Sequence, residues 1–343
     1  MKVTFFQRKP RASGNFSLEF IFDDVRERLD GKIKHVKVVA PYLSNGFFRR
    51  VGICFHAWRR QSDVNHVTGD TNFTAISLRR ERTLLTILDC GSLSGLSGWK
   101  KWIMKKVWFD WPIASSNIVT TISNSVKREI LEHTNCDPQK IRVVPVAVSE
   151  KFKRTDRDFS NVPRIMHLGT APNKNLPRLI EALKGIPCTL VVVGKLNEET
   201  RRLAEQHSID IENHFNLPWD DVIQLYVDCD IVAFVSTYEG FGMPIVEANV
   251  VGRVVVTGNV SSMPEVAGNS ACLVDPFDAD SIRTGILRVI EDSGYRESLI
   301  ANGFENARRF HGDAIAKMYL EIYEEIANKS QTKRMNHANK VPS

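Results

Sequence analysis

Short apolar runs alternate with longer amphipathic stretches along most of the 343-residue chain. Runs such as residues 84–88 (LLTIL) and 231–235 (IVAFV) are rich in β-branched and aromatic residues, which is typical of buried strands. Stretches with helical periodicity, for example residues 176–183, lie between such runs. The runs that predict strands are residues 3–6, 35–40, 84–88, 118–121, 141–144, 164–168, 189–193, 211–215, 231–235, 254–257 and 271–274. Residues 64–70 (VNHVTGD) predict a further short strand that opens into a loop. This alternation predicts parallel, doubly wound sheets, and so an α/β fold.

The periodicity is lost in the polar residues 150–161, which therefore predict a boundary between two domains. A chain of this length is expected to form about two domains, each large enough for its own core. We predict two Rossmann-like domains, at residues 1–155 and 160–308. A helix is expected at about 309–328, and the polar and basic residues 329–343 are expected to be a disordered tail.

Residues 236–252 (STYEGFGMPIVEANVVG) lie between two predicted strands and predict a turn followed by a helix. Pro244 is expected at the first helical position, where its missing N–H costs nothing. The N–H groups of Phe241, Gly242 and Met243 would then point toward one place at the helix N-terminus. Because glycine lets a phosphate approach the backbone closely, this turn predicts an anion site.

Two carboxylates accompany this predicted anion site. Glu239 lies in the turn and Glu247 near the first turn of the helix. Carboxylates beside an anion site are better suited to bind hydroxyl groups or to stabilise developing positive charge than to bind the anion. The pattern indicates an anionic, polyhydroxylated ligand, such as a nucleotide sugar. The alternative is that the glutamates only complement the helix dipole.

Another strand-to-helix turn, at residues 169–175 (GTAPNKN), carries a lysine. Gly169 and Thr170 open this turn and are candidate contacts to the expected nucleotide-sugar ligand. The ammonium group of Lys174 is well placed there to neutralise a diphosphate.

Three other sites allow more than one interpretation. His66 at a strand end is either a structural histidine or an imidazole at the edge of a cleft, in contact with donor or acceptor hydroxyls. Asp89 follows a buried strand and is either a turn cap or an acceptor contact. The Asp-x-Asp pairs at 228–230 and 278–280 resemble a metal motif. The first pair, however, leads into a strand, and the second is better explained as a helix N-cap.

Charge is unevenly distributed along the chain, whose net charge is +6. Residues 1–150 hold 24 lysines and arginines against 14 acidic residues, and the remainder holds 22 against 26. A basic half can bind nucleic acid, an anionic membrane surface or an anionic substrate. No nucleic-acid motif accompanies the charge, so the last two partners are favoured.

Residues 98–111 contain four of the six tryptophans together with four lysines. This composition is typical of segments at a membrane interface, and it would suit a lipid-linked or membrane-proximal acceptor. The alternative is a helix packed on the first domain with its lysines directed outward.

No run of about 18 apolar residues predicts a membrane span, and the first ten residues predict a strand rather than a signal segment. The six cysteines are scattered without CxxC pairs, which indicates free thiols in a reducing compartment. The expected location is therefore the cytoplasm, with peripheral attachment to the inner face of the membrane if residues 98–111 are interfacial.

Four segments occur in a characteristic order and spacing: 239–244 (EGFGMP), Glu247, 262–268 (SMPEVAG) and 273–276 (LVDP). They resemble the signature of the group 1 glycosyltransferases (family 4, retaining, GT-B fold). The resemblance is strong from about residue 164 to 291 and looser before. It implies two Rossmann-like domains that face each other across a cleft, with the donor held mainly by the second and the acceptor by the first.

The resemblance also implies a reaction. We expect retaining, metal-independent transfer of a hexosyl group from a nucleotide diphospho-sugar to a saccharide or lipid-linked saccharide acceptor, in the synthesis of a surface polysaccharide such as lipopolysaccharide or capsule. No cofactor is implied besides the donor. Glu239 would contact the transferred sugar and Glu247 the ribose hydroxyls. Lys174 and the amides of residues 241–243 would stabilise the departing diphosphate.

The resemblance places Gly14 in a loop over the donor phosphates, and it implies that the helix at 309–328 crosses back onto the first domain. The chain departs from the family pattern at three positions. Asn173 stands where an arginine is usual, Leu88 where many members have a histidine, and Val146 where an asparagine is usual.

Two other functions stay open. A nucleotide-sugar epimerase of the same architecture would need acid–base residues at the sugar carbon. A non-catalytic nucleotide-binding module would be consistent with the departures from the family pattern. A dinucleotide oxidoreductase is less consistent with the chain, because no GxGxxG follows any predicted strand.

Overall fold

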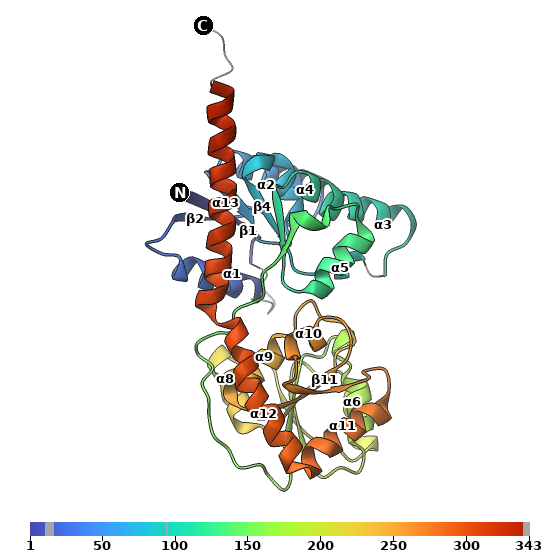
Figure 1. The fold of residues 1–343 in the computed structure, drawn as a ribbon. Helices are drawn as coiled ribbons and strands as arrows, with labels where there is room; N and C mark the ends of the chain where they lie inside the picture. The colour runs from blue at the N-terminus through green and yellow to red at the C-terminus, as the bar shows by residue number, and fades with distance from the viewer. Residues whose placement is uncertain (11–16, 94, 339–343) are drawn as a thin grey trace. The chain divides into compact units, whose positions relative to one another are not determined.

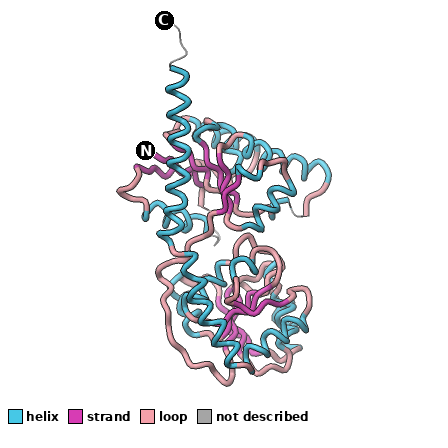
Figure 2. Tube along the Cα trace, in the orientation of Figure 1, coloured by secondary structure: helices cyan, strands magenta, loops and turns pink. Residues whose placement is uncertain are grey.

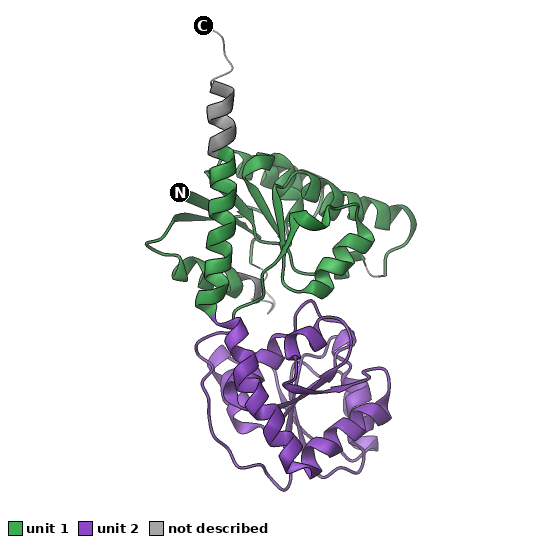
Figure 3. Cartoon of the chain, viewed as in Figure 1, with its two compact units in different colours: residues 1–147, 312–343 green, residues 148–311 purple. Residues whose placement is uncertain are grey.

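The computed structural model describes residues 1–10, 17–93 and 95–338 (Figure 1). The chain forms two compact units, which are coloured separately in Figure 3. Unit 1 consists of Met1–Ala147 and Gly312–Ser343, and unit 2 of Val148–His311. The chain therefore leaves unit 1 at residue 147, about eight residues before the predicted end of the first domain, and returns to it at residue 312.

Unit 1 contains a six-stranded parallel sheet with strand order β2-β1-β3-β4-β5-β6. The strands are β1 (Lys2–Gln7), β2 (Lys34–Val39), β3 (Val64–Val67), β4 (Thr83–Ile87), β5 (Ile118–Thr121) and β6 (Ile141–Val143). The α-helices are α1 (Ser17–Arg28), α2 (Phe47–Trp58), α3 (Gly98–Lys105), α4 (Trp111–Ala114), α5 (Asn124–His133) and α13 (Gly312–Ala338). Shorter helical segments are η1 (Asn72–Ser77), η2 (Arg80–Arg82), η3 (Gly91–Leu93), the π-helical η4 (Lys106–Asp110) and η5 (Pro138–Lys140).

Unit 2 contains a second six-stranded parallel sheet, with strand order β12-β11-β10-β7-β8-β9. Its strands are β7 (Arg164–Leu168), β8 (Thr189–Val193), β9 (Asp210–His214), β10 (Ile231–Phe234), β11 (Val254–Gly258) and β12 (Ala271–Val274). Its α-helices are α6 (Leu176–Leu183), α7 (Glu198–Gln206), α8 (Trp219–Asp228), α9 (Met243–Val251), α10 (Met263–Ala267), α11 (Ala279–Glu291) and α12 (Ser293–Ala307). Two short 3-10 segments are η6 (Pro172–Lys174) and η7 (Arg308–Phe310).

Each sheet lies inside its unit with helices around it, as the strands and helices of Figure 2 show. Strands that are covered on both faces need near-continuous apolar sequences, and β4 and β10 are buried along their whole length. The α/β fold class is confirmed, and the observed strands agree with the predicted ranges to within one residue at each end.

The last helix contributes to the core of unit 1. Tyr319 and Tyr323 of α13 are almost fully buried, and they lie against the rings of Phe22 and Phe5 at 5.8 and 5.9 Å between centroids. Ile315 of α13 belongs to the same hydrophobic cluster and is 1% exposed. These contacts hold α13 against α1 and β1 (Figure 1).

Two helical segments differ from their predicted extent. The helix expected at about 309–328 begins only at Gly312, after the buried Phe310, because residues 308–310 form a 3-10 turn that follows α12. The helix α13 then continues to Ala338, so residues 329–338 of the expected disordered tail are helical. No glycine or proline interrupts these residues, and Lys329 pairs with Glu325 one turn earlier at 2.6 Å, which supports the helix. Among the described helices, none combines the length and apolar character that crossing a bilayer requires.

His66 lies in the same cluster of unit 1, and its burial has a consequence for stability. Its Nδ1 lies 2.9 Å from the Tyr323 hydroxyl, and its Nε2 lies 2.7 Å from Thr86 Oγ1. Burial, and to a smaller extent the nearby charge of Arg26, lower the pKa of His66 from 6.5 to about 3. The ring therefore stays neutral in the folded chain at pH values where an unfolded chain would protonate it.

We expect His66→Gln to flatten the pH dependence of stability. Burial of the neutral His66 ring makes the unfolding free energy depend on pH. The part of the unfolding free energy that depends on His66 is highest above pH 6.5 and falls as the pH drops toward 3, because over this range only the unfolded chain gains the proton. Between pH 5.5 and 4.5 the unfolding free energy of the wild type should therefore fall relative to that of His66→Gln by about 1.4 kcal/mol. Urea unfolding at both pH values measures this difference. The partly exposed His35 gives a control, His35→Gln, and a constant difference between wild type and His66→Gln would contradict the prediction.

Candidate active site

The order of strands in unit 2 creates a place for a ligand at one edge of the sheet. The chain proceeds from β7 outward to β9, and then returns to the other side of β7 with β10. The loops that follow β7 and β10 therefore leave the carboxyl edge in opposite directions. Ligands of open α/β sheets bind in the crevice at such a switch point, and both predicted loops of the site, residues 169–175 and 235–242, lie there.

The structure brings the predicted cation and the predicted carboxylate together. Lys174 Nζ lies 2.7 Å from Glu239 Oε1, and the two side chains are 23% and 15% exposed. The ammonium group also lies 4.9 Å from the centre of the Phe234 ring, which attracts it electrostatically. The charges of both candidates are thus partly neutralised by each other.

Asn173 links the same two loops. Its side-chain amide donates to the carbonyl of Tyr238 at 3.0 Å, and its own carbonyl accepts from the amide of Thr237 at 2.8 Å. The residue that replaces the family's usual arginine therefore supplies no positive charge, but it fixes the loop that carries Glu239 to the loop that carries Lys174.

The helix α9 begins at this site, as predicted. Its N-cap is Gly242, with φ of 109°, a left-handed conformation that glycine adopts without strain. The Phe241 side chain is buried against the ring of Phe310, and this contact anchors the turn to the core. The first amide of the helix is that of Met243. An uncapped N-terminus of this kind leaves amide groups that can bind an anion.

Two serines fix the carbonyl groups of the turn. Ser262 Oγ donates to the carbonyls of Glu239 and Phe241, at 2.9 and 2.7 Å. Ser261 Oγ donates to the Glu239 carbonyl at 2.5 Å. The two serine hydroxyls thus fix the backbone carbonyls of Glu239 and Phe241 in the turn before α9.

Glu247 lies on α9 and is only 5% exposed, because α9 is buried on nearly all sides. Its Oε2 accepts a hydrogen bond of 2.5 Å from the hydroxyl of Tyr226, a fully buried residue of α8. Burial raises the pKa of Glu247 to about 7, although this hydrogen bond and the charge of Lys174 both act to lower it. Glu247 is thus a carboxyl group that titrates near neutral pH.

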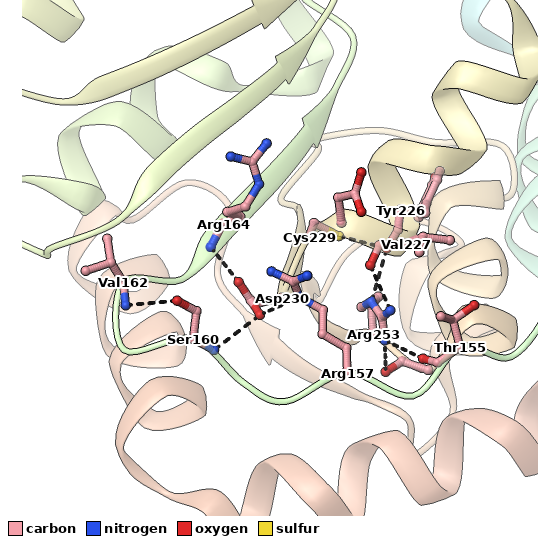
Figure 4. A network of polar contacts seen from close by, with 12 residues as sticks. Thr155, Arg157, Ser160, Val162, Arg164, Tyr226, Val227, Cys229, Asp230 and Arg253 are labelled. Atoms are coloured by element: carbon pink, nitrogen blue, oxygen red, sulfur yellow. Dashed lines mark hydrogen bonds and ion pairs between the residues drawn. The ribbon is translucent and has the colours of Figure 1, made fainter.

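The position of Tyr226 depends on Arg253, which directly precedes β11. Arg253 Nε donates to the carbonyl of Tyr226 at 3.1 Å, and Arg253 Nη2 donates to that of Val227 at 2.8 Å (Figure 4). The last carbonyl groups of an α-helix have no partner within the helix, and here the guanidinium group supplies one. Arg253, Tyr226 and Glu247 therefore form a continuous series of contacts from the end of α8 to the site.

A second group in Figure 4 holds the chain where it enters unit 2. Asp230, which is 4% exposed, accepts hydrogen bonds from Arg157 Nε at 3.0 Å and from the amides of Ser160 and Arg164 at 3.3 and 2.8 Å. All oxygens of this carboxylate thus have protein partners. The Asp-x-Asp pair at 228–230 therefore has a structural role.

Gly169 and Thr170 form the base of the Lys174 loop. Gly169 has φ of 89°, and a Cβ placed on it would lie 3.0 Å from the Lys174 side chain. The Thr170 hydroxyl donates to the carbonyl of Lys195 in the neighbouring loop at 3.0 Å. Gly169 is thus needed for the stem of Lys174 to pack closely, while Thr170 joins two loops at the carboxyl edge.

The other candidates are placed elsewhere. Of the two interpretations of His66, the structure agrees with a structural histidine, since the ring is 0% exposed and both nitrogens have partners inside unit 1. Gly14 lies outside the described residues.

The two acidic sites with alternative interpretations have capping contacts. Asp89 accepts from the amide of Gly91 at 2.9 Å, which agrees with turn capping. Asp278 is the N-cap of α11, as predicted, and accepts from the amide of Asp280. Among the described residues, no group of three or more His, Cys, Asp or Glu side chains could hold a metal ion.

Sequence reasoning missed the residues that support the site. Tyr226 and Arg253 belong to no motif, and Ser262 opens the 262–268 segment without a predicted role. In the sequence, Asn175 is only the last residue of the 169–175 turn. In the structure it has φ of 66°, and its side-chain amide donates to the carbonyls of Val235 and Pro276 at 3.0 and 2.6 Å. The only available signal was the placement of polar residues beside predicted buried strands, where a hydrogen-bond partner is obligatory.

Comparison with known proteins agrees with this geometry. Residues 150–306 match the family model described as "Glycosyl transferases group 1". This part of the chain belongs to the group 1 glycosyl transferases. The matched region contains the switch point, Lys174, Glu239, α9 and the supporting residues Tyr226 and Arg253.

Curated relatives and solved structures are similar to larger parts of the chain. The serotype-specific mannosyltransferase WbdA of Escherichia coli is 27% identical over 66% of this chain and 31% of WbdA. The O-antigen chain mannosyltransferase B of Escherichia coli is 28% identical over 61% of each chain. The crystal structure of Anabaena HepE, in complex with UDP and glucose, covers 95% of this chain and 100% of that one, at 18% identity and a TM-score of 0.76. The chain thus spans less than two thirds of the length of the curated relatives, and the structural match shows that the glycosyltransferase fold called GT-B is present, as predicted.

We expect Tyr226→Phe to lower the unfolding free energy by an amount that depends on pH. The variant removes only the hydroxyl group that binds Glu247. At pH 8, where a carboxyl group of pKa about 7 is ionised, the lost charged hydrogen bond should cost about 1.5–3 kcal/mol. At pH 6, where it is largely protonated, the cost should be closer to 1 kcal/mol. Denaturant unfolding at both pH values measures it.

Tyr319→Phe is the matched control. Tyr319 is buried like Tyr226, and its hydroxyl interacts with the uncharged Thr86 and Thr120. Its loss should cost the same at pH 6 and pH 8. An equal cost at both pH values for Tyr226→Phe would show that Glu247 does not titrate between them.

Proposed function

We propose that the protein is a retaining glycosyltransferase that moves a hexosyl group from a nucleotide diphospho-sugar to a hydroxyl group of a saccharide or lipid-linked saccharide. The observation that carries the proposal is the Lys174–Glu239 pair beside the N-terminus of α9. A cation, a helix N-terminus and a carboxylate at one switch point can bind a group that is anionic at one end and rich in hydroxyls at the other.

Each charged residue has a separate task in this proposal. Lys174 and the amides of residues 241–243 bind the diphosphate and stabilise its charge as it departs. Glu239, released from Lys174 by the incoming diphosphate, contacts the transferred sugar at the carbon that becomes positive. Glu247 accepts hydrogen bonds from the ribose hydroxyls. The departing phosphate takes the proton of the acceptor hydroxyl, so the reaction needs no separate protein base.

The relatives support a role in surface polysaccharide synthesis. Two of them are named for serotype-specific and O-antigen mannosyl transfer, and HepE binds UDP and glucose. We infer the same class of product here, with unit 2 as the donor-binding domain and the basic unit 1 as the acceptor-binding domain.

The proposal is tested by incubating the protein with a panel of nucleotide sugars, with and without saccharide acceptors, and analysing the products. A new glycosidic bond with the anomeric configuration of the donor is expected only when an acceptor is present. An epimer of the donor formed without acceptor would indicate an isomerase instead. Stabilisation by a nucleotide sugar in thermal unfolding without consumption of it under any condition would indicate a binding module.

We expect Glu247→Ala to weaken the binding of nucleoside diphosphates. The loss of a hydrogen bond to a charged group should reduce affinity by roughly 1–3 kcal/mol. Wild-type affinity should also rise from pH 6 to pH 8 as Glu247 ionises around pH 7, whereas the variant should lack this component. Titration calorimetry with one nucleotide at both pH values measures both effects. Glu297→Ala, on the exposed face of α12, is the control, and unchanged affinity of Glu247→Ala for every nucleotide tested would refute the ribose assignment.

We expect Glu239→Gln to reduce turnover more than donor affinity. The amide can still accept a hydrogen bond from Lys174, but it cannot stabilise positive charge at the sugar, so kcat should fall by roughly a hundredfold with a smaller change in KM. Steady-state kinetics with the donor found in the panel measure both constants. Glu181→Gln, on the exposed side of α6, should behave as wild type. A fully active Glu239→Gln variant would remove the catalytic role.

A further inference from the structure

The helix α2 in unit 1 has two apolar sides, and only one of them is packed. Ile53 and Ala57 are buried, and Ile53 packs with Phe73 in a small cluster of its own. The other side is exposed to solvent. Its members are Phe47 (72% exposed), Phe48 (87%), Val51 (50%), Phe55 (56%) and Trp58 (56%).

These exposed residues form one continuous stripe, called here the α2 stripe. Residues 48, 51, 55 and 58 are spaced so that they lie along one side of an α-helix. Phe47 lies 5.6 Å from Phe48 and Phe55 lies 5.8 Å from Trp58, measured between ring centres. A helix on the surface of a globular unit needs only one apolar side, and a continuous exposed patch marks an interaction surface.

The last turn of α2 borders a basic hollow of about 540 Å³. The hollow is lined by Lys2, Thr4, Val36, Lys37, Val38, Val39, His56, Arg59, Arg60 and Gln61. None of these lining residues is acidic. Acidic residues that contact the lining include Asp23, 3.0 Å from Lys37 Nζ, and Asp63, which accepts from the amide of Lys2. The four cations of the lining, Lys2, Lys37, Arg59 and Arg60, favour an anionic occupant.

A second exposed aromatic group lies on α3, within residues 98–111. Trp99 and Trp102 are 69% and 59% exposed, and Lys100 lies 5.9 Å from the Trp99 ring. The segment that follows α3 packs on the same small cluster as α2, because Trp108 contacts Phe73 and the Arg50 guanidinium group. Figure 1 shows α2, α4 and α3 in the same part of unit 1.

We propose that the α2 stripe docks unit 1 onto an anionic lipid bilayer, with a lipid headgroup phosphate held in the basic hollow at the end of α2. Aromatic side chains beside arginine and lysine are the composition that binds at the interface between headgroups and acyl chains. A second copy of the chain fits less well, because two identical basic rims would repel each other. The stripe and hollow are separate from the donor site in unit 2, so the proposal does not depend on the transfer reaction.

Vesicle flotation of the full chain tests the proposal. Vesicles of phosphatidylcholine alone are compared with vesicles that also contain phosphatidylglycerol, without any nucleotide or acceptor. The wild type should float with the anionic vesicles and far less with the neutral ones. Phe48→Ser and Phe55→Ser should each lower the bound fraction several-fold, and Arg59→Glu combined with Arg60→Glu should lower affinity at least about tenfold.

Matched controls come from equally exposed positions on unit 2. Phe215, which is 54% exposed, gives Phe215→Ser, and the exposed Arg201 and Arg202 give the paired charge reversal. Both variants should leave vesicle binding unchanged. Circular dichroism confirms that each variant is folded, which is expected because the altered side chains are exposed. The proposal is overturned if the wild type does not bind anionic vesicles, or if the α2 variants bind as well as the wild type. It is also overturned if light scattering shows a dimer that Phe48→Ser dissociates, since the stripe would then be a contact between copies.

Discussion

The reversal of strand order between β7 and β10 is the constraint on which the rest of unit 2 depends. Because the chain returns to the other side of β7, two loops leave the same edge of the sheet in opposite directions. The polar groups of these loops therefore come together at this edge. Lys174 and Glu239 come from segments 65 residues apart, yet the reversal places them 2.7 Å from each other.

The site is held by neutral hydrogen bonds and only secondarily by charge. Asn173, Ser262 and Thr170 each bind the backbone of a neighbouring loop, so the loops are connected before any ligand binds. In the proposed reaction the diphosphate exchanges the Lys174–Glu239 contact for one of its own. The partly neutralised pair thus lets a cation and a carboxylate remain half-buried without the large cost of unpaired charge.

Sequence reasoning located the elements of the fold well, because buried parallel strands have a composition that surface segments lack. It also identified Lys174, Glu239, Gly242 and Glu247, since glycine turns and helix starts place such residues at a sheet edge. It could not find Tyr226, whose partner Glu247 is 21 residues away in the chain. It could not decide between a structural and a cleft-facing His66, because the end of a strand looks the same in sequence whether a helix covers it or not.

The second apolar side of α2 escaped notice for a related reason. Helical periodicity shows that apolar residues share a side, but it cannot show which of two sides is packed. The tryptophans of residues 98–111 are conspicuous by composition, whereas the phenylalanines of α2 lie in a stretch that the sequence indicates only as a basic helix. Only their exposed fractions distinguish the two cases.

The division of unit 1 into two segments has a consequence for synthesis of the chain. Tyr319 and Tyr323 fill the core of unit 1 against Phe5 and Phe22, although they are translated some 300 residues later. Unit 2 is one uninterrupted segment, Val148–His311. During translation, unit 2 can therefore complete its core while unit 1 still lacks α13, with His66 and its neighbours uncovered. Domains generally fold in order from the N-terminus, and here the N-terminal unit must finish last.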